Sequence, residues 1–154
     1  MTCVTRYLWE SDEDIVSDFC KKCSELGYEN NSSLKAMKWD WNEVQWVGTF
    51  TDKLVSLSGI HAFPEMGSNA FRVMFRGASL PGISRTFLNF KQIPLKAEWA
   101  LLKCDDPVFY VTFNTTGRSK RMGNAIARRK DFTYIKNMIY FNVEQEIWKY
   151  DYQF

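Results

Sequence analysis

The stretch FYVTFNTTGRSKRMGNAIARR, residues 109–129, decides how the rest of the chain can be arranged. Its first part is apolar at successive positions, which is typical of a strand near the centre of a sheet that is covered on both faces. This strand, over 108–114, ends at Asn114, and a turn leads into a basic helix over about 118–130. A covered strand that runs into a helix predicts an α/β domain.

Upstream of this junction the sequence predicts three strands in succession, over 44–50, 53–63 and 71–77. The dipeptide Thr51-Asp52 between the first two indicates a tight antiparallel turn. A short connection joins the second strand to the third, so the three strands form an antiparallel meander.

Two further helices are predicted outside the meander. A first strand over 3–9 is followed by Ser11 and an acidic run, which favour a helix N-terminus. Apolar residues then recur at helical spacing, at Ile15, Phe19, Cys23 and Leu26. The chain from 78 to 92 has no clean period and is predicted to be a long loop, after which Pro94 opens a helix with an apolar stripe at Leu95, Trp99 and Leu102.

The remaining segments complete the fold prediction. A polar arm is expected over 28–42, and two closing strands over about 133–141 and 143–150. Strands in succession with helices elsewhere predict a mixed α/β (α+β) fold, in which a mostly antiparallel central sheet carries helices on both faces. The absence of repeats or linkers predicts a single domain over 1–154.

Composition limits the function classes. The chain has 154 residues, 45% of them apolar, and a net charge of +2, which argues against a dedicated nucleic-acid partner. A membrane span needs roughly 18 to 20 continuous apolar residues, and the sequence shows no such run and no signal-peptide core at its start. We therefore expect a cytoplasmic protein without a membrane partner.

The four cysteines include a Cys20-x-x-Cys23 pair that could suggest zinc or redox chemistry. Both members lie in a helical pattern, no second such pair is present, and His61 is the only histidine. Tetrahedral zinc would need more ligands than this. Reduced thiols without a metal are the expectation.

The order of these elements, together with the passage from Asn114 to Met122, resembles the GCN5-related N-acetyltransferase (GNAT) superfamily over nearly the whole chain. The closing IYFNVEQEIWKYD also looks like small acetyltransferase-like proteins of phages. The resemblance implies transfer of an acyl group from acetyl-CoA, or another acyl-CoA, to an amine on a small molecule or a protein. It also implies that neighbouring parallel strands ending in Phe75 and Asn114 diverge and leave a V-shaped slot for the thioester.

Two positions depart from the family pattern. In the phosphate-binding loop, Ser79 and Pro81 stand where the family has Gly and Gly or Ala, and a proline has no N–H to offer a phosphate. The loop is therefore damaged, or it is rebuilt later around Gly82, Ile83, Ser84 and Arg85. Where the family often has a tyrosine that protonates the leaving thiolate, this chain has Met122, so that Tyr134 or Tyr110 would have to replace it.

By the same resemblance, a set of residues near the slot and the two helix starts would bind the cofactor: Val73, Met74, Phe75, Arg76, Gly77, Gly82, Ser84, Arg85, Asn114, Ser119 and Arg121. Backbone N–H groups near Val73 to Phe75 would polarise the thioester carbonyl. Asn114 is equally consistent with a strand-ending residue that bonds its own turn. Ser119 is equally an early helix residue.

His61, Glu65 and Tyr134 are the catalytic candidates. His61 is the one side chain that ordinarily titrates near neutrality, and its predicted strand is where substrate amines approach in the family. On an apolar strand face it could also be a hydrogen-bonded core residue. Glu65 is an alternative base or a plain loop carboxylate, and Tyr134 is the alternative acid.

Two other function classes remain open. The altered loop and the missing tyrosine favour a catalytically degenerate GNAT-like binding protein, such as a viral factor that acts on a host protein in the host cytoplasm. The basic run over 118–130 could instead bind an anion or nucleic acid, although a solvated helix face is the commoner cause of such a run. The sequence leaves the oligomeric state undetermined.

Overall fold

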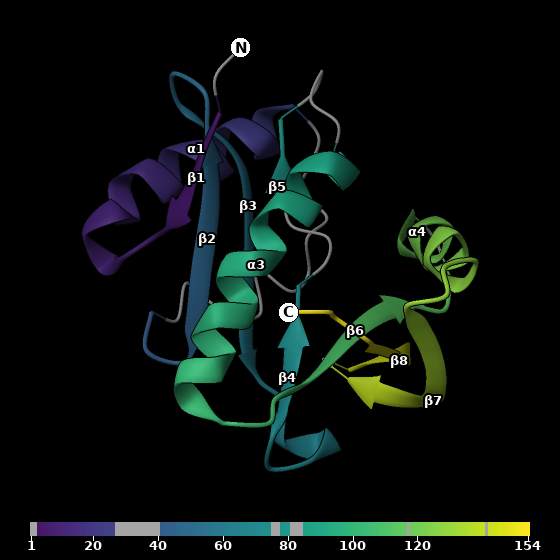
Figure 1. Ribbon diagram of the computed structural model, residues 1–154. Coiled ribbons are helices and arrows are strands. Elements are labelled where there is room, and N and C mark those ends of the chain that lie inside the picture. Colours follow the sequence, from purple (N-terminus) through teal and green to yellow (C-terminus); the bar gives the residue numbers. More distant parts are fainter. Residues whose placement is uncertain (1–2, 27–40, 75–77, 81–84, 117, 141) are drawn as a thin grey trace.

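The computed structural model describes residues 3–26, 41–74, 78–80, 85–116, 118–140 and 142–154. The elements follow in the order β1 (Val4–Tyr7), η1 (Glu10–Asp12), α1 (Glu13–Glu25), β2 (Val44–Phe50), β3 (Leu54–Ala62), η2 (Pro64–Met66), β4 (Ala70–Val73), β5 (Ala78–Ser79), α3 (Arg85–Lys103), β6 (Val108–Asn114), α4 (Arg118–Ala127), β7 (Phe132–Tyr140) and β8 (Val143–Tyr150). Figure 1 shows how they are arranged.

One mixed sheet organises the fold. Its strands lie in the order β1-β2-β3-β4-β6-β8-β7, and β5 pairs with β3 beside this path. The pairing of β4 with β6 is parallel, whereas the other pairs are antiparallel. The predicted mixed, mostly antiparallel sheet is confirmed, and the parallel pair lies at its centre.

Helices cover both faces of the sheet, as predicted. Successive residues of a strand point to opposite faces, and in β3 Leu57 packs in the cluster that contains α1 while the hydroxyl of Ser58 bonds to Gln92 of α3. α4 lies on the same face as α3, because Ile126 of α4 shares a buried cluster with Ile93 of α3. The domain thus has three layers, with α1 on one side and α3 and α4 on the other (Figure 1).

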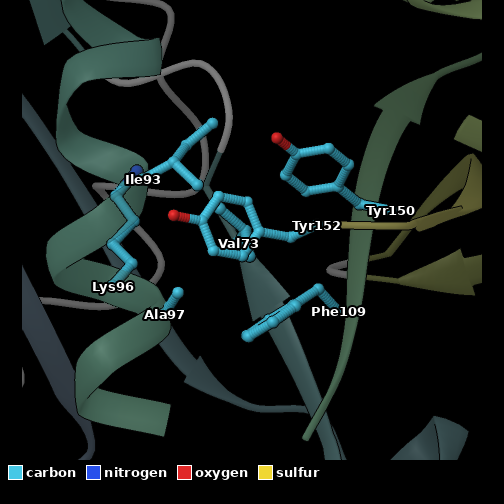
Figure 2. A pocket seen from close by; sticks show the side chains of 7 residues that line it. All are labelled: Val73, Ile93, Lys96, Ala97, Phe109, Tyr150 and Tyr152. Atoms are coloured by element: carbon cyan, nitrogen blue, oxygen red, sulfur yellow. The ribbon is translucent and has the colours of Figure 1, made fainter. Parts of the chain in front are cut away.

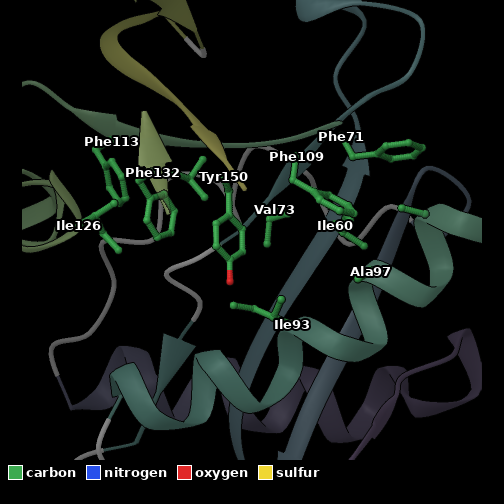
Figure 3. Packing of buried hydrophobic residues seen from close by; sticks show 12 residues of the cluster. Ile60, Phe71, Val73, Ile93, Ala97, Phe109, Phe113, Ile126, Phe132 and Tyr150 are labelled. Carbon is green, nitrogen blue, oxygen red and sulfur yellow. The ribbon is translucent and has the colours of Figure 1, made fainter. Parts of the chain in front are cut away.

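Burial follows the alternation of the strands. β6 buries Phe109, Val111 and Phe113 on the face that carries α3 and α4, while its even-numbered residues are half-buried on the other face. Figure 3 shows how side chains from β3, β4, β6, β8 and the two helices form one continuous cluster on this face. This cluster joins the two halves of the sheet where β4 meets β6.

The helix predicted to open at Pro94 begins nine residues earlier, at Arg85, so Pro94 lies inside α3. The predicted apolar stripe was also wrong, because Leu102 is 83% exposed and Trp99 is only half-buried. The buried face consists of Gln92, Ile93, Lys96, Ala97 and Ala100. Two polar residues on this face conceal its periodicity from a search for apolar residues.

Other boundaries differ by smaller amounts. The strand predicted over 71–77 ends at Val73, and the chain resumes extended pairing in β5, inside the predicted loop. In α1, Ile15 is exposed, and the buried face comprises Val16, Phe19 and Cys23. Most of the arm expected over 28–42 lies outside the described residues.

Among the helices that the structure describes, none combines the length and the apolar character that a membrane crossing requires.

Candidate active site

The centre of the sheet opens where β4 and β6 part. Their parallel pairing runs from Ala70–Val108 to Arg72–Tyr110. Beyond it, the N–H of Met74 donates to the carbonyl of Gly59 on β3 at 2.8 Å, and β5 continues along the same strand. β6 instead pairs with β8 as far as Asn114. The two halves of the sheet diverge from this point, as Figure 1 shows. The divergence of the two parallel strands that the resemblance implies is therefore confirmed as far as Met74, where the described part of the chain after β4 ends.

A small cavity lies in the angle between these strands, on the face that carries α3. Its lining comes from β4, β6, α3 and the end of the chain: Val73, Phe109, Ile93, Lys96, Ala97, Tyr150 and Tyr152. These side chains close around it so tightly that no water molecule fits inside, so the cavity must widen before the end of an acyl chain can enter (Figure 2).

Lys96 is the cationic residue of this lining. Its side chain is fully buried at 0% exposure, and its Nζ donates to the carbonyl oxygen of Met74 at 3.0 Å. Burial lowers the pKa of Lys96 to about 7, because the charged form loses its hydration. The ammonium thus lies beside the residue at which β4 leaves β6.

The remaining wall of the cavity is aromatic. Tyr150 stacks on Phe132 with ring centroids 4.5 Å apart, and burial raises the pKa of its phenol to about 12. Tyr152 and Phe154 each pack against Phe109, at centroid distances of 6.2 and 6.0 Å. The rings of Tyr150 at the end of β8 and of Tyr152 just after it therefore form the aromatic side of the cavity.

On the opposite face of the same strands, Arg72 organises a buried polar cluster. Its Nε donates to Thr112 Oγ1 at 2.9 Å, its Nη1 lies 3.2 Å from His61 Nε2, and its guanidinium lies 5.3 Å from the ring centroid of Tyr140. Burial lowers the pKa of Arg72 to about 10, so the residue remains cationic at neutral pH. A fixed positive charge thus stands directly behind the slot.

His61 is held in one tautomer within this cluster. Its Nδ1 lies 2.7 Å from the carbonyl of Ala62, and since a carbonyl only accepts, Nδ1 carries the proton. Nε2 then accepts from Arg72. Burial and the charge of Arg72 together lower the pKa of His61 to about 4, so His61 is neutral at physiological pH.

The structure separates the three predicted catalytic residues. Glu65 lies exposed on η2, in the connection that joins β3 to β4. Tyr134 lies on the edge strand β7, where it is 46% exposed and its hydroxyl donates to Asn137 at 2.7 Å. Two strands lie between it and β4. His61 is therefore the only one of the three that lies in the buried cluster with Arg72.

The predicted cofactor residues have different outcomes. Val73 lines the cavity, Met74 borders it through Lys96, and Asn114 ends β6 opposite Gln145. Arg85 is the first residue of α3, and Ser119 and Arg121 lie in the first turn of α4. Five other predicted cofactor residues lie outside the described part of the chain: Phe75, Arg76, Gly77, Gly82 and Ser84. Tyr110, the other possible replacement for the family's acid, faces away from the cavity and packs against Phe63.

Part of the basic run has an acidic partner that lies just beyond it. Arg129 forms two hydrogen bonds with the carboxylate of Asp131, at 2.9 and 2.7 Å, and lies over the ring of Phe132. Arg128 and Lys130 are exposed. The cations of this run therefore include at least one whose charge is offset.

Sequence reasoning missed Lys96, Arg72, Tyr150 and Tyr152. A signal for Lys96 was present, because a lysine at position 96 interrupts the helical set Ile93, Ala97 and Ala100 and so falls on its buried side. Arg72 likewise stands between Phe71 and Val73 in a strand that is buried throughout. No comparable local signal marks Tyr150 or Tyr152, whose position depends on the pairing of β8 with β6.

Comparison with solved structures identifies the fold. No family model and no curated protein matches this sequence. An acetyltransferase of the GNAT family from Staphylococcus aureus superposes with a TM-score of 0.68 at 7% identity, covering 98% of this chain and 100% of that one. An acyl-CoA N-acyltransferase from Pseudomonas aeruginosa gives 0.63 at 10% identity, covering 97% and 98%.

A third solved structure is a chimeric spermidine N-acetyltransferase built in part from the Vibrio cholerae enzyme. It gives a TM-score of 0.60 at 10% identity and covers 97% of this chain and 95% of that one. Full coverage in both directions means that the whole described chain follows the same architecture. The chain therefore has the GNAT acyl-CoA N-acyltransferase fold.

Proposed function

We propose that this protein is an acyl-CoA-dependent N-acyltransferase that acetylates an amine. The divergence of β4 from β6 carries the proposal, because it separates two strands at the centre of the sheet, where an acyl thioester would enter once the closed cavity beside them widens. The similarity to solved acetyltransferases supports the same reading at the level of the fold. Since one fold hosts many activities, the proposal depends on the slot.

The residues present fit the acyl end of such a cofactor. The cavity offers apolar walls from Val73, Ala97 and Phe109 and one buried cation, which suits a short acyl chain next to a polarised group. Acetyl-CoA would supply an activated acyl group as a thioester. Asn114 at the end of β6 and the N-termini of α3 and α4, near Arg85, Ser119 and Arg121, are the proposed contacts for the rest of the cofactor.

The acceptor amine would approach from the face opposite α3. There Arg72 and His61 form a polar cluster beside the diverging strands. An amine must lose a proton when it becomes an amide, and Glu65, His61 or solvent can accept it. Burial and the charge of Arg72 make His61 a weak base, and both of its ring nitrogens are engaged by Arg72 and Ala62, so Glu65 and solvent remain the proposed acceptors.

The carbonyl of the thioester requires a hydrogen-bond donor. The N–H of Met74 is already donated to Gly59, so it is engaged within the sheet. Of the predicted donors from Val73 to Phe75, Phe75 lies outside the described residues, and the N–H of Val73 on β4 remains the proposed donor.

The acceptor is proposed as an amine of a small molecule or of a protein. One neighbour in fold is a spermidine N-acetyltransferase, which makes polyamines a reasonable first set of acceptors to assay. A phage origin and a cytoplasmic location, in the host if the protein is viral, complete the proposal.

Acetyl-CoA binding tests the proposal directly. Thermal unfolding is measured with acetyl-CoA at millimolar concentration, and thiol release is followed with a panel of polyamines, aminosugars and peptides. A rise in Tm that saturates with acetyl-CoA, with thiol release that depends on one amine, is the expected result. No rise in Tm at millimolar acetyl-CoA would remove the proposal.

A second function is favoured by one observation. The aromatic rings of Tyr150 and Tyr152 help to close the cavity, which suits a GNAT-like binding protein that has lost its catalyst. Such a protein, including a viral factor that acts on a host protein, would not respond to acetyl-CoA. The same thermal titration therefore separates the two functions.

A further inference from the structure

Lys96 has a position that the proposed function does not yet use. The residue lies in the fourth turn of α3, and its whole side chain is buried between the helix and the diverging strands. Its Nζ carries three N–H donors, of which one reaches the Met74 carbonyl at 3.0 Å. Figure 2 shows the side chain at the wall of the cavity, together with the rings of Tyr150, Tyr152 and Phe109.

Capping the Met74 carbonyl does not by itself require a lysine. One turn earlier, the neutral amide of Gln92 is also fully buried and bonds to Thr49, Ser56 and Ser58 of the neighbouring strands. The same helix face thus satisfies polar groups without a charge. A buried ammonium is far more costly than an amide, and such groups are concentrated at functional sites.

Among the described residues, no carboxylate forms an ion pair with this cation. Burial lowers the pKa of Lys96 to about 7. The titratable groups that share its cavity are the phenols of Tyr150 and Tyr152, while β4 and β6 contribute Val73 and Phe109. Tyr150, with a pKa of about 12, is a much weaker acid than the ammonium.

We propose that Lys96 is the catalytic acid of the acyl transfer, placed by α3 to donate a proton to the sulfur of the departing thiolate. The inference rests on the proposed function and extends it. It also assigns a residue to the task for which this chain has Met122 in place of the family's tyrosine. Sulfur would leave toward the α3 face, opposite the side from which the amine approaches.

The step balances without a further reactant. The amine nitrogen forms the new C–N bond with the acyl carbon, and the C–S bond breaks with its electron pair going to sulfur. Lys96 transfers its Nζ proton to that sulfur and becomes a neutral amine. The proton lost by the attacking nitrogen goes to a base or to solvent, and Lys96 is reprotonated from solvent before the next turnover.

Three variants separate this role from a structural one. Lys96→Met removes donor and charge, Lys96→Gln retains an N–H donor, and Lys96→Arg retains a cation that does not release its proton. We expect kcat to fall at least ~100-fold in all three, with the KM for acetyl-CoA little changed. Lys103→Met, at the exposed end of the same helix, is the matched control and should retain full kcat.

The pH profile provides the second readout. In the unmodified protein kcat should decline as pH rises above about 7, because the acid must be protonated. This alkaline limb should be absent in Lys96→Arg. If Lys96→Gln retains kcat and the limb, Lys96 only caps the Met74 carbonyl and the inference is overturned.

A third readout does not depend on activity. In protein labelled with ¹³C at lysine Cε, the resonance that Lys96→Met removes belongs to Lys96. It should titrate near pH 7 and should shift when CoA is added, whereas the resonance of Lys103 should not respond to CoA. A Lys96 resonance unmoved by saturating CoA overturns the inference and leaves the proposed function in place. Absence of both CoA binding and thiol release in the unmodified protein overturns both.

Discussion

The guanidinium of Arg72 donates from Nη1 to Nε2 of His61 at 3.2 Å, while the other ring nitrogen of His61 donates to the carbonyl of Ala62 at 2.7 Å. Protonation of His61 at Nε2 would break the hydrogen bond that this nitrogen accepts from Arg72, and it would place a second positive charge beside the guanidinium. The fold therefore holds the neutral imidazole. This pair explains why a histidine on the predicted strand is a poor base.

The stability of the protein should fall in acid partly because of His61. Its folded pKa, about 4, lies below the ordinary 6.5, so the unfolded chain binds a proton first. The resulting loss in the free energy of unfolding is absent above pH 6.5 and grows as the pH falls toward 4. It reaches about 3 kcal/mol, because each pKa unit corresponds to about 1.4 kcal/mol. Chemical unfolding of the unmodified protein and of His61→Gln between pH 4 and 8 measures it.

His61→Gln should lose less stability than the unmodified protein between pH 6.5 and 4, and the two should run parallel above pH 7. Equal losses in both proteins would show that His61 does not carry this pH dependence. The same variant also tests catalysis. Thiol release that survives the substitution assigns the proton acceptor to Glu65 or solvent.

Lys96→Met should stabilise the protein at neutral pH. The folded pKa of Lys96, about 7, lies below the ordinary 10.5, so burial of the cation opposes folding at and below pH 7 and ceases to do so above 10.5. The full cost is up to about 5 kcal/mol at about 1.4 kcal/mol per pKa unit. Loss of the hydrogen bond to the Met74 carbonyl reduces this gain in the free energy of unfolding by about 1–3 kcal/mol.

A net gain of about 2 kcal/mol at pH 7 is therefore expected for Lys96→Met, shrinking as pH rises toward 10. Denaturant unfolding at a series of pH values measures this difference. A variant that is less stable than the parent at pH 7 and equally so at pH 10 would contradict the reading of Lys96 as a costly buried cation. Such a stability gain with a loss of turnover would mark a residue retained for function.

Local pattern was enough to predict most strands. The bounds of β2 and β6 agree with the predicted 44–50 and 108–114, because an apolar run with clear turn residues on both sides limits where a strand can extend. The predicted helix that corresponds to α3 was too short because a local signal was misleading. Pro94 is a strong local signal for a helix start, yet the helix continues through the proline, with Gln92 and Ile93 buried immediately before it.

The site was harder to predict than the fold. His61 and Arg72 are paired residues of β3 and β4, but their contact depends on a register that the sequence does not state. Lys96 meets Met74 only because α3 crosses back over the strand that precedes it. Tyr150 faces Phe109 through the insertion of β8 between β6 and β7, which is a non-local choice of partner.

Gln92→Leu should destabilise the protein by about 1–3 kcal/mol, because it leaves the buried Ser58 hydroxyl without its Gln92 partner and removes a hydrogen bond to Thr49. Gln92 Nε2 donates to Thr49 Oγ1 at 3.0 Å, and Thr49 keeps its hydrogen bond with Thr5 in the variant. Thermal unfolding measures the loss. The double variant Gln92→Leu/Ser58→Ala removes the unpaired hydroxyl and should recover part of the stability. A double variant no more stable than the single one would exclude the Ser58 hydroxyl as the cause.

Ala97→Leu tests whether the cavity receives the acyl group. Ala97 lines the closed cavity, so three added carbons must displace its walls, and the variant should lose about 1–3 kcal/mol of stability. Ala100 is fully buried one turn later and does not line it, so Ala100→Leu should overpack the core and cost about 1–3 kcal/mol. Acetyl-CoA should bind Ala97→Leu at least ~10-fold more weakly, a loss of about 1.4 kcal/mol by calorimetry. Unchanged affinity in a folded Ala97→Leu would show that the acyl end lies elsewhere in the slot.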